Sequence, residues 1–271
     1  MTGWQFAREG QPFLIAGPCV VEPNEVLFRI ADRLVEIGRR LGIPVCFKAS
    51  FDKANRSGVD AARGPGIEEG LAALEGVRRR TGLPLLTDVH EPAQVARVAE
   101  VVDAVQVPAF LCRQTDLLVA CGAAGKPVNV KKGQWMDAEA MRGAVEKVRR
   151  GGSSDVAVTE RGTFFGYGDL VVDFRNVSRL RQATRAPVVF DATHSVQQPG
   201  RGHDGTSGGA REFVPVLLKA AAAAGVDGFF LETHPDPAQA LSDRETQWPL
   251  GELEGLVQQA LRVWRAAQAG S

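Results

Sequence analysis

Short apolar runs rich in β-branched residues alternate with amphipathic helical patterns along almost the whole chain. Each run has the length of a strand that is buried on both faces, and the segment after it spaces its apolar residues as a helix does. The predicted strands cover residues 13–20, 45–51, 85–90, 104–110, 128–132, 156–161, 188–194 and 228–234. The predicted helices cover residues 24–40, 67–81, 92–101, 115–124, 137–149, 176–184, 210–224 and 252–267.

This alternation constrains the fold class. Eight doubly buried strands that alternate with helices are typical of a closed parallel barrel. The sequence therefore predicts a single-domain α/β protein, a (β/α)8 TIM barrel over residues 1–271. A doubly wound open sheet is the alternative, but it usually has a G-x-G-x-x-G turn after its first strand, and none follows residues 13–20.

Charge is balanced, with 32 basic and 32 acidic residues, so no basic excess favours nucleic acid or an anionic membrane as a partner. No apolar run reaches the ~20 residues of a membrane helix, and the first ten residues lack the apolar core of a secretory signal. The four cysteines show neither C-x-x-C spacing nor a disulfide-rich frame. We therefore expect a cytoplasmic protein with reduced thiols and with no nucleic-acid or membrane partner.

Polar or charged residues stand at the C-terminal end of each predicted strand. In a barrel these ends converge on one rim, where barrel active sites lie. Side chains alternate between the inside and the outside of a barrel, which selects one inward-facing set. A single strand-end charge is often only solvated, but one at every strand end favours a site. The predicted inward set is Cys19, Lys48, Asp88, Gln106, Lys131, Arg161, His194 and Glu232.

Two chemistries stand out among these residues and their neighbours. Lys48, Lys131 and Arg161, with Lys53 and Arg56 in the loop after the second strand, concentrate positive charge in a neutral protein. Such a cluster suits a phosphate or carboxylate ligand, which arginine grips in a bidentate way and lysine holds as a point charge.

The second chemistry combines a thiol, an imidazole and two carboxylates, from Cys19, His194, Glu232 and Asp243. This mixture fits a divalent transition metal better than magnesium. Because the residues lie on different predicted strands, their spacing does not define a site. Two alternatives stay open: Cys19 packs as a small apolar residue, and His194 is a hydrogen-bonded residue of the rim.

Eight segments of the chain resemble the 3-deoxy-D-manno-octulosonate 8-phosphate synthases, over residues 13–250. The sister DAHP synthases, which use erythrose 4-phosphate, typically carry Lys-Pro-Arg-Thr where this chain has KANRS at 53–57, so the octulosonate family is favoured. The segments are IAGPCVVE (15–22), FKASFDKANRSG (47–58), TDVHEP (87–92), QVPAFLCRQTDLL (106–118), NVKKGQ (129–134), TERGTFFGYGDLVVDFR (159–175), FDATHSVQQPG (190–200) and FLETHPDPAQALSD (230–243).

The resemblance implies an activity. Phosphoenolpyruvate would condense with D-arabinose 5-phosphate and water to give 3-deoxy-D-manno-octulosonate 8-phosphate and inorganic phosphate, for lipopolysaccharide biosynthesis. A DAHP-type synthase and a phosphosugar-binding barrel without catalysis remain the alternatives. The resemblance also implies that Asn55, Arg56 and Ser57 bind the sugar phosphate. Phosphoenolpyruvate would be held by Lys48, Lys53, Gln106, Ala109, Lys131 and Arg161.

Further roles follow from the same resemblance. One branch of the family has Asn at the end of the first strand and needs no metal, whereas the other has Cys in a GPC segment and needs one. Cys19 places this chain in the metal branch, with His194, Glu232 and Asp243 as the other ligands of one Zn, Fe, Mn or Co ion. Arg113 would reach into a neighbouring subunit's site, so we expect a homo-oligomer, in particular a homotetramer. Catalysis would involve Lys131 and proton transfer by Asp88, His194 or Asp243.

Overall fold

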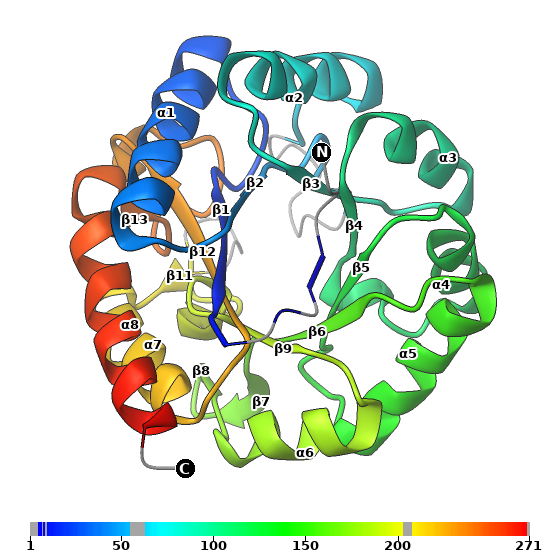
Figure 1. The fold of residues 1–271 in the computed structure, drawn as a ribbon, viewed down its shortest axis with the longest axis vertical. Helices are drawn as coiled ribbons and strands as arrows, with labels where there is room; N and C mark the ends of the chain where they lie inside the picture. Colours follow the sequence, from blue (N-terminus) through cyan, green and yellow to red (C-terminus); the bar gives the residue numbers. More distant parts are fainter. Residues whose placement is uncertain (1–4, 7, 9, 55–62, 203–207, 270–271) are drawn as a thin grey trace.

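A computed structural model describes residues 5–6, 8, 10–54, 63–202 and 208–269. Within these ranges, eight parallel strands close into a barrel inside a ring of eight α-helices, which confirms the predicted (β/α)8 fold (Figure 1). Each strand pairs with the next one along the chain, and the last pairs with the first. The barrel strands are β1 (Phe13–Gly17), β2 (Val45–Lys48), β3 (Leu85–Asp88), β4 (Ala104–Val107), β5 (Val128–Lys131), β6 (Val156–Glu160), β9 (Val188–Asp191) and β12 (Gly228–His234).

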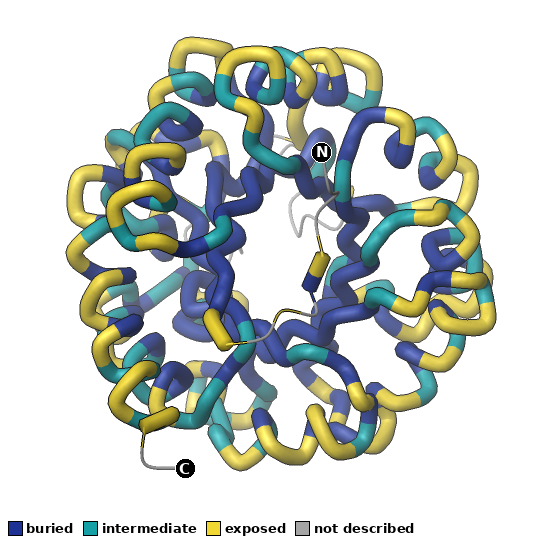
Figure 2. Tube along the Cα trace, in the orientation of Figure 1, coloured by how far each residue is buried: buried dark blue, intermediate teal, exposed yellow. Residues whose placement is uncertain are grey.

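The helices bury one face against the barrel and expose the other (Figure 2). α1 and α2 end at Gly42 and Gly82, which adopt the left-handed conformation that closes a helix, after last turns rich in arginine. α3 starts at Pro92 with a capping box between Glu91 and Gln94. The helices are α1 (Asn24–Leu41), α2 (Ile67–Thr81), α3 (Pro92–Val101), α4 (Thr115–Ala123), α5 (Ala138–Gly151), α6 (Arg175–Thr184), α7 (Val214–Ala223) and α8 (Leu253–Gln268).

Most barrel strands end earlier than the sequence predicted, at the rim that carries the polar residues. Pro18 follows β1 and Pro108 follows β4, and proline has no amide hydrogen to donate to the next strand. A parallel bridge between Val20 and Ser50 resumes the pairing of the first two strands beyond Pro18. The break therefore leaves Cys19 in a short irregular segment and not in a continuous strand.

Short elements at the same rim were not predicted. β7 (Thr163–Gly166) and β8 (Asp169–Val171) form an antiparallel hairpin after β6. β10 (Gln197–Gln198) pairs with β11 (Gly208–Gly209), and β13 (Trp248–Pro249) adds to β12. The segment predicted as a helix from 210 begins instead as a 3-10 turn, η4 (Arg211–Phe213), before α7. Loops with their own structure thus surround the barrel mouth.

The described part of the N-terminal segment lies across the opposite end of the barrel (Figure 1). Phe6 is fully buried there, packs against Phe13 with ring centroids 5.7 Å apart, and donates its amide to Asp155. All four cysteines are buried free thiols. None of the described helices is long and apolar enough to cross a membrane.

Candidate active site

Pairing of β1 with β12 closes the barrel and sets the centre of the site. Gly17 lies beside Glu232 in the register of this pair. A Cβ atom on Gly17 would lie 2.0 Å from the carbonyl oxygen of Lys48, so only glycine allows β1 and β2 to approach this closely. The Lys48 ammonium donates to Glu232 Oε1 at 2.8 Å and to the Cys19 carbonyl at 3.0 Å. Lys48 therefore ties together the ends of the first, second and last barrel strands.

A second buried cation lies across the barrel mouth. Lys131 Nζ donates to Asp191 Oδ2 at 2.5 Å and lies 3.6 Å from the centroid of the Phe230 ring. The same Asp191 oxygen is 2.7 Å from His194 Nδ1, and its other oxygen accepts the His194 amide at 2.9 Å. One carboxylate thus fixes both the lysine and the imidazole. A carboxylate on one ring nitrogen is how proteins commonly orient a histidine whose other nitrogen binds a metal.

A chain of hydrogen bonds joins neighbouring strands below this pair. The Gln106 amide donates to Asp88, and Asn129 Nδ2 donates to Gln106 Oε1 at 2.8 Å. Thr159 donates to the Asn129 oxygen at 2.7 Å, so the chain crosses from β3 to β6. The other oxygen of Asp88 accepts from Ser50, which also accepts from Lys53 Nζ at 3.0 Å. These amides are buried but paired, which rigidifies this side of the mouth.

The expected metal ligands gather at the opposite side of the mouth. Ligand atoms of Cys19, Glu232 and Asp243 all lie within 4.8 Å of one another. The fourth expected ligand, His194, places Nε2 at 3.5 Å from Glu232 Oε2. This Glu232 oxygen is buried and accepts no hydrogen bond from the described residues. A buried carboxylate oxygen without a described hydrogen bond, beside a thiol, an imidazole and a second carboxylate, fits a divalent transition metal.

Electrostatics support the same reading of this cluster. Burial raises the pKa of the Cys19 thiol far above its usual value, and the Asp243 and Glu232 carboxylates raise that pKa further. Sγ lies 2.9 Å from Asp243 Oδ2 and 3.0 Å from the Ser242 hydroxyl. A thiolate at this place would be a third negative charge in a low-dielectric pocket. A bound divalent cation would reverse this balance, because metal ligation deprotonates a thiol.

The cations have perturbed pKa values of their own. Burial lowers the pKa of Lys131, and the Asp191 carboxylate offsets this only in part. Burial would also lower the pKa of Lys53, but the acidic groups around it, Cys19 and Glu232 foremost, outweigh burial and raise that pKa. Arg161 is buried, and its NH1 has no hydrogen-bond partner among the described residues. A guanidinium nitrogen held in this way is prepared to bind an anion.

With the geometry in view, the chain can be compared with known proteins. The family model described as the DAHP synthetase I family matches residues 6–267. The 2-dehydro-3-deoxyphosphooctonate aldolase of Acidithiobacillus ferrooxidans is 53% identical over 257 residues, covering 95% of this chain and 91% of the relative. The chain belongs to the DAHP synthetase I family. Enzymes of the same name from Methylobacillus flagellatus and Alkalilimnicola ehrlichii are 53% and 51% identical, over 95% and 97% of this chain and 92% and 94% of theirs.

The remaining predicted residues of this family member lie in three places. Ala109 is buried at the start of a 3-10 turn, η1 (Ala109–Leu111), directly after Gln106 and its strand. Arg113 is exposed, its carbonyl accepts a hydrogen bond from Lys147 at 2.9 Å, and its side chain makes no ion pair with any described residue. The predicted sugar-phosphate ligands lie outside the described residues; they are Asn55, Arg56 and Ser57.

Asp191, Ser242 and Gln197 contact side chains of the expected metal ligands but were not in the predicted set. Asp191 could have been included, because it lies in the predicted strand 188–194, three residues before His194, a spacing that lets a carboxylate reach the ring. Ser242, beside Asp243, and Gln197, which bridges Arg161 and Asp243, carry no such signal in the sequence. Their places depend on how the loops after β9 and β12 fold back over the mouth.

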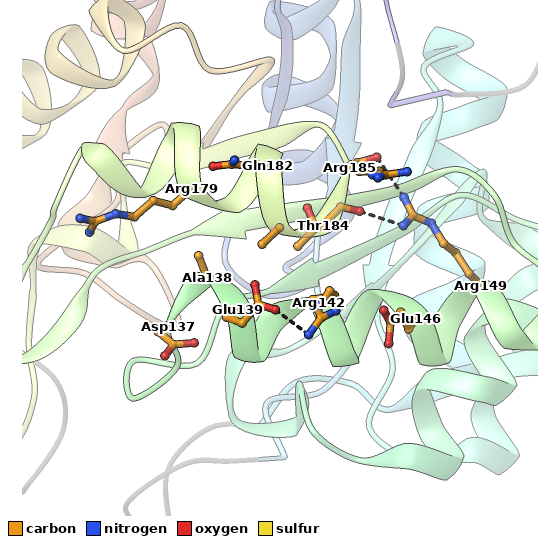
Figure 3. A pocket seen from close by; sticks show the side chains of 11 residues that line it. Asp137, Ala138, Glu139, Arg142, Glu146, Arg149, Arg179, Gln182, Thr184 and Arg185 are labelled. Atoms are coloured by element: carbon orange, nitrogen blue, oxygen red, sulfur yellow. Dashed lines mark hydrogen bonds and ion pairs between the residues drawn. The ribbon is translucent and has the colours of Figure 1, made fainter.

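A separate hollow of about 770 Å³ lies on the outer layer between α5 and α6 (Figure 3). Its charges are largely satisfied within the protein: Glu139 pairs with Arg142 at 2.5 Å, and Arg149 donates to the carbonyls of Thr184 and Arg185. The described residues that line it include none of the predicted site residues. The barrel mouth, and not this hollow, is therefore the candidate active site of this family member.

The buried carboxylates predict a specific dependence of stability on pH. Burial would raise the pKa of Asp191, but His194 and Lys131 outweigh burial and hold that pKa well below its usual value. Its contribution to the free energy of unfolding is therefore fully present above pH ~4, the pKa of an unfolded aspartate, and is lost as the pH falls below that value. Asp191→Asn should remove this contribution. Its free energy of unfolding should fall less steeply in acid than that of the wild type, by up to about 1.4 kcal/mol per pH unit.

Urea unfolding at a series of pH values from neutral to acid measures these slopes. Asp116→Asn is the matched control, since Asp116 is exposed on α4, and it should keep the wild-type slope. An equal slope for Asp191→Asn and the wild type would contradict the ion pairing described for Asp191.

Proposed function

We propose that this chain condenses phosphoenolpyruvate with D-arabinose 5-phosphate and water to form 3-deoxy-D-manno-octulosonate 8-phosphate and inorganic phosphate. The observation that carries the proposal is the meeting of four buried or half-buried cations at one rim of a protein with no net charge: Lys48, Lys53, Lys131 and Arg161. Two phosphorylated substrates repel each other, and a preorganised set of cations is what holds them together. The name of the close relatives agrees with this reaction.

Lys131 and Arg161 are proposed to bind the anionic groups of phosphoenolpyruvate, with help from Lys48, Lys53, Gln106 and Ala109. NH1 of Arg161 supports this role, because it is buried and has no hydrogen-bond partner among the described residues. Lys131 can also contact the ligand, because its present partner Asp191 is shared with His194. An arriving phosphate or carboxylate would share the Lys131 charge and would not need to create a new cation site.

The reaction can be followed bond by bond. The methylene carbon of phosphoenolpyruvate attacks the aldehyde carbon of the sugar, a carbon–carbon bond forms, and the aldehyde oxygen gains a proton. Positive charge then rests on the enol carbon, where water adds and gives up a proton. The hydroxyl formed from that water loses its proton as the carbon–oxygen bond to phosphate breaks, so a ketone remains and inorganic phosphate leaves with the bonding electrons. Asp88, His194 and Asp243 are the proposed groups for these proton transfers, since they line the mouth at which both carbons meet.

A divalent metal would be held by Cys19, His194, Glu232 and Asp243, and would supply Lewis-acid chemistry, polarising an oxygen of a substrate or of water. The Glu232 oxygen that accepts no hydrogen bond from the described residues, and the crowded acidic groups, support this assignment. Lys48 donates to Glu232 Oε1 at 2.8 Å, which leaves Oε2 of Glu232 to face the ion. Asp191 does the same for His194, whose Nδ1 it occupies.

The acceptor sugar is assigned from the loop after β2. Asn55 offers both a donor and an acceptor to sugar hydroxyls, and a site that hydrogen-bonds such groups rejects a substrate that lacks them. Arg56 and Ser57 would hold the distal phosphate at a distance set by the length of the sugar. A four-carbon sugar could not place its aldehyde and its phosphate correctly at the same time. This length requirement favours arabinose 5-phosphate over erythrose 4-phosphate.

Release of inorganic phosphate from phosphoenolpyruvate, measured with each sugar and with none, tests the function. We expect rapid release with arabinose 5-phosphate. With erythrose 4-phosphate the rate of release should be lower by a factor of at least about 100, because a misplacement of ~1 Å has that effect on rate. Lys131→Met controls for contaminating phosphatase and should release none above background. An equal or higher kcat/KM with erythrose 4-phosphate would assign the chain to the DAHP-type reaction. Binding of both substrates without release would support a non-catalytic barrel.

We also propose that the active enzyme is a homo-oligomer, in particular a homotetramer, in which Arg113 completes a neighbour's site. Arg113 lies three residues after Phe110, which forms an exposed aromatic pair with Trp135: the two are 50% and 44% exposed, with ring centroids 5.9 Å apart. On the nearby hairpin, Phe165 and Tyr167 are almost fully exposed. An apolar surface of this kind beside a strand-end rim is typical of a protein interface. A second copy of the chain would cover these rings and bring in its arginine.

Hybrid oligomers test this arrangement. Arg113→Ala and Lys131→Met chains should each be nearly inactive, yet mixed and reassembled chains should regain activity, since one site can then take Lys131 from one chain and Arg113 from the other. A purification tag on only one of the two chains, used to capture mixed oligomers, verifies that hybrids have formed. Verified hybrids without recovered activity would show that Arg113 serves its own chain's site or has no part in it.

A further inference from the structure

Gln197 joins the two halves of the mouth. Its Oε1 accepts a hydrogen bond from Arg161 NH2, and its Nε2 donates to Asp243 Oδ1 at 2.8 Å. Arg161 belongs to the cation set, and Asp243 to the metal-ligand set. No other described side chain makes hydrogen bonds to both of these residues. The primary amide is rigid and planar, so its two contacts fix the guanidinium and the carboxylate relative to each other.

The backbone of Gln197 is held firmly enough for this task. Gln197 pairs with Gly209 in the two-stranded β10–β11 ribbon, and Ala210 donates its amide to the Val196 carbonyl at 3.0 Å. A Cβ atom on Gly209 would lie 2.2 Å from the methyl group of Thr246, so glycine is needed for the ribbon to lie against the loop that carries Asp243. The bridge is therefore supported by backbone on both of its sides.

Each contact fixes the orientation of one functional group. With Oδ1 bound by Gln197, Asp243 turns Oδ2 toward Cys19 Sγ, 2.9 Å away, and toward the Ser242 hydroxyl. With NH2 bound by Gln197, Arg161 keeps NH1 buried and without a described partner. Gln197 thus orients one residue of each subsite by occupying the atom that the ligand does not need.

We propose that Gln197 is a positioning residue that supports both metal binding and phosphoenolpyruvate binding through one amide group. The inference rests on the proposed function, since it takes Arg161 as an anion ligand and Asp243 as a metal ligand. Loss of the amide would release the side chains of Arg161 and Asp243. The affinity for the metal should therefore fall even without phosphoenolpyruvate, and the affinity for phosphoenolpyruvate should fall even without the metal.

The test measures the two affinities separately on the full-length protein. Gln197→Met keeps the length of the side chain and removes both hydrogen bonds. We expect Zn²⁺ affinity, measured by chelator competition without substrate, to fall about 10- to 100-fold, as for other residues that orient a metal ligand. We expect phosphoenolpyruvate affinity, measured by calorimetry on protein stripped of metal, to fall roughly tenfold for the lost hydrogen bond to a charged group.

Two further variants sharpen the comparison. Gln197→Asn keeps the amide on a side chain one methylene shorter, which cannot span both partners, and should lose affinity for at least one of the two ligands. Gln198→Met is the matched control: the neighbouring glutamine donates to Asp169 on the outer hairpin at 2.7 Å and should leave both affinities unchanged. Thermal unfolding of each variant verifies that it is folded.

The outcomes separate the inference from the proposed function. Wild-type protein that binds no Zn²⁺ would contradict the proposed metal site, and the inference with it. Wild type that binds both ligands, while Gln197→Met loses only one affinity or neither, would contradict the inference alone. Equal losses in Gln197→Met and Gln198→Met would show a general effect on the ribbon and would also contradict it.

Discussion

Closure of the barrel through the β1–β12 pair is the constraint on which the site depends. The register of that pair sets Gly17 beside Glu232, although the two residues are separated by most of the chain (Figure 1). Lys48 then reaches Glu232 and the Cys19 carbonyl from the next strand. A shift of one residue in this register would turn Glu232 out of the mouth, because side chains alternate along a strand. The expected metal ligands and the cations, which come from both ends of the sequence, therefore meet only if the barrel closes in this register.

Opposite charges make the mouth compatible with folding. Buried Lys48 and Lys131 would each be unfavourable alone, and each is paired with a fully buried carboxylate, Glu232 or Asp191. Buried ion pairs contribute little net stability, because desolvation offsets most of their attraction. In the proposed function these pairs would hold cations ready for anionic substrates at a buried site. The same charged residues would then hold the site together and bind its substrates.

The sequence was sufficient to predict the barrel, since eight buried strands alternating with helices fit few other folds. It was also sufficient to predict that the polar strand-end residues lie at one rim, because strand ends of a barrel converge whatever their exact register. It did not predict the early ends of strands such as β1 and β4, which depend on prolines at the rim. The ribbon that carries Gln197 and the loop that carries Ser242 could not be predicted, since both are placed by contacts between distant loops. The roles of Asn55, Arg56 and Ser57 rest on the resemblance, because these residues lie outside the described structure.

The central claim is that Cys19 and the acidic groups beside it form a metal site that the synthase reaction requires. X-ray absorption at the metal edge of zinc-loaded protein tests it most directly, because sulfur and lighter ligands scatter differently. The account predicts one sulfur at about 2.3 Å with nitrogen and oxygen ligands at about 2.0–2.2 Å. It also predicts that Cys19→Ala loses the sulfur signal together with most of the bound metal and activity. Nitrogen and oxygen ligands alone in the wild type, or full activity of protein shown to contain no metal, would contradict it.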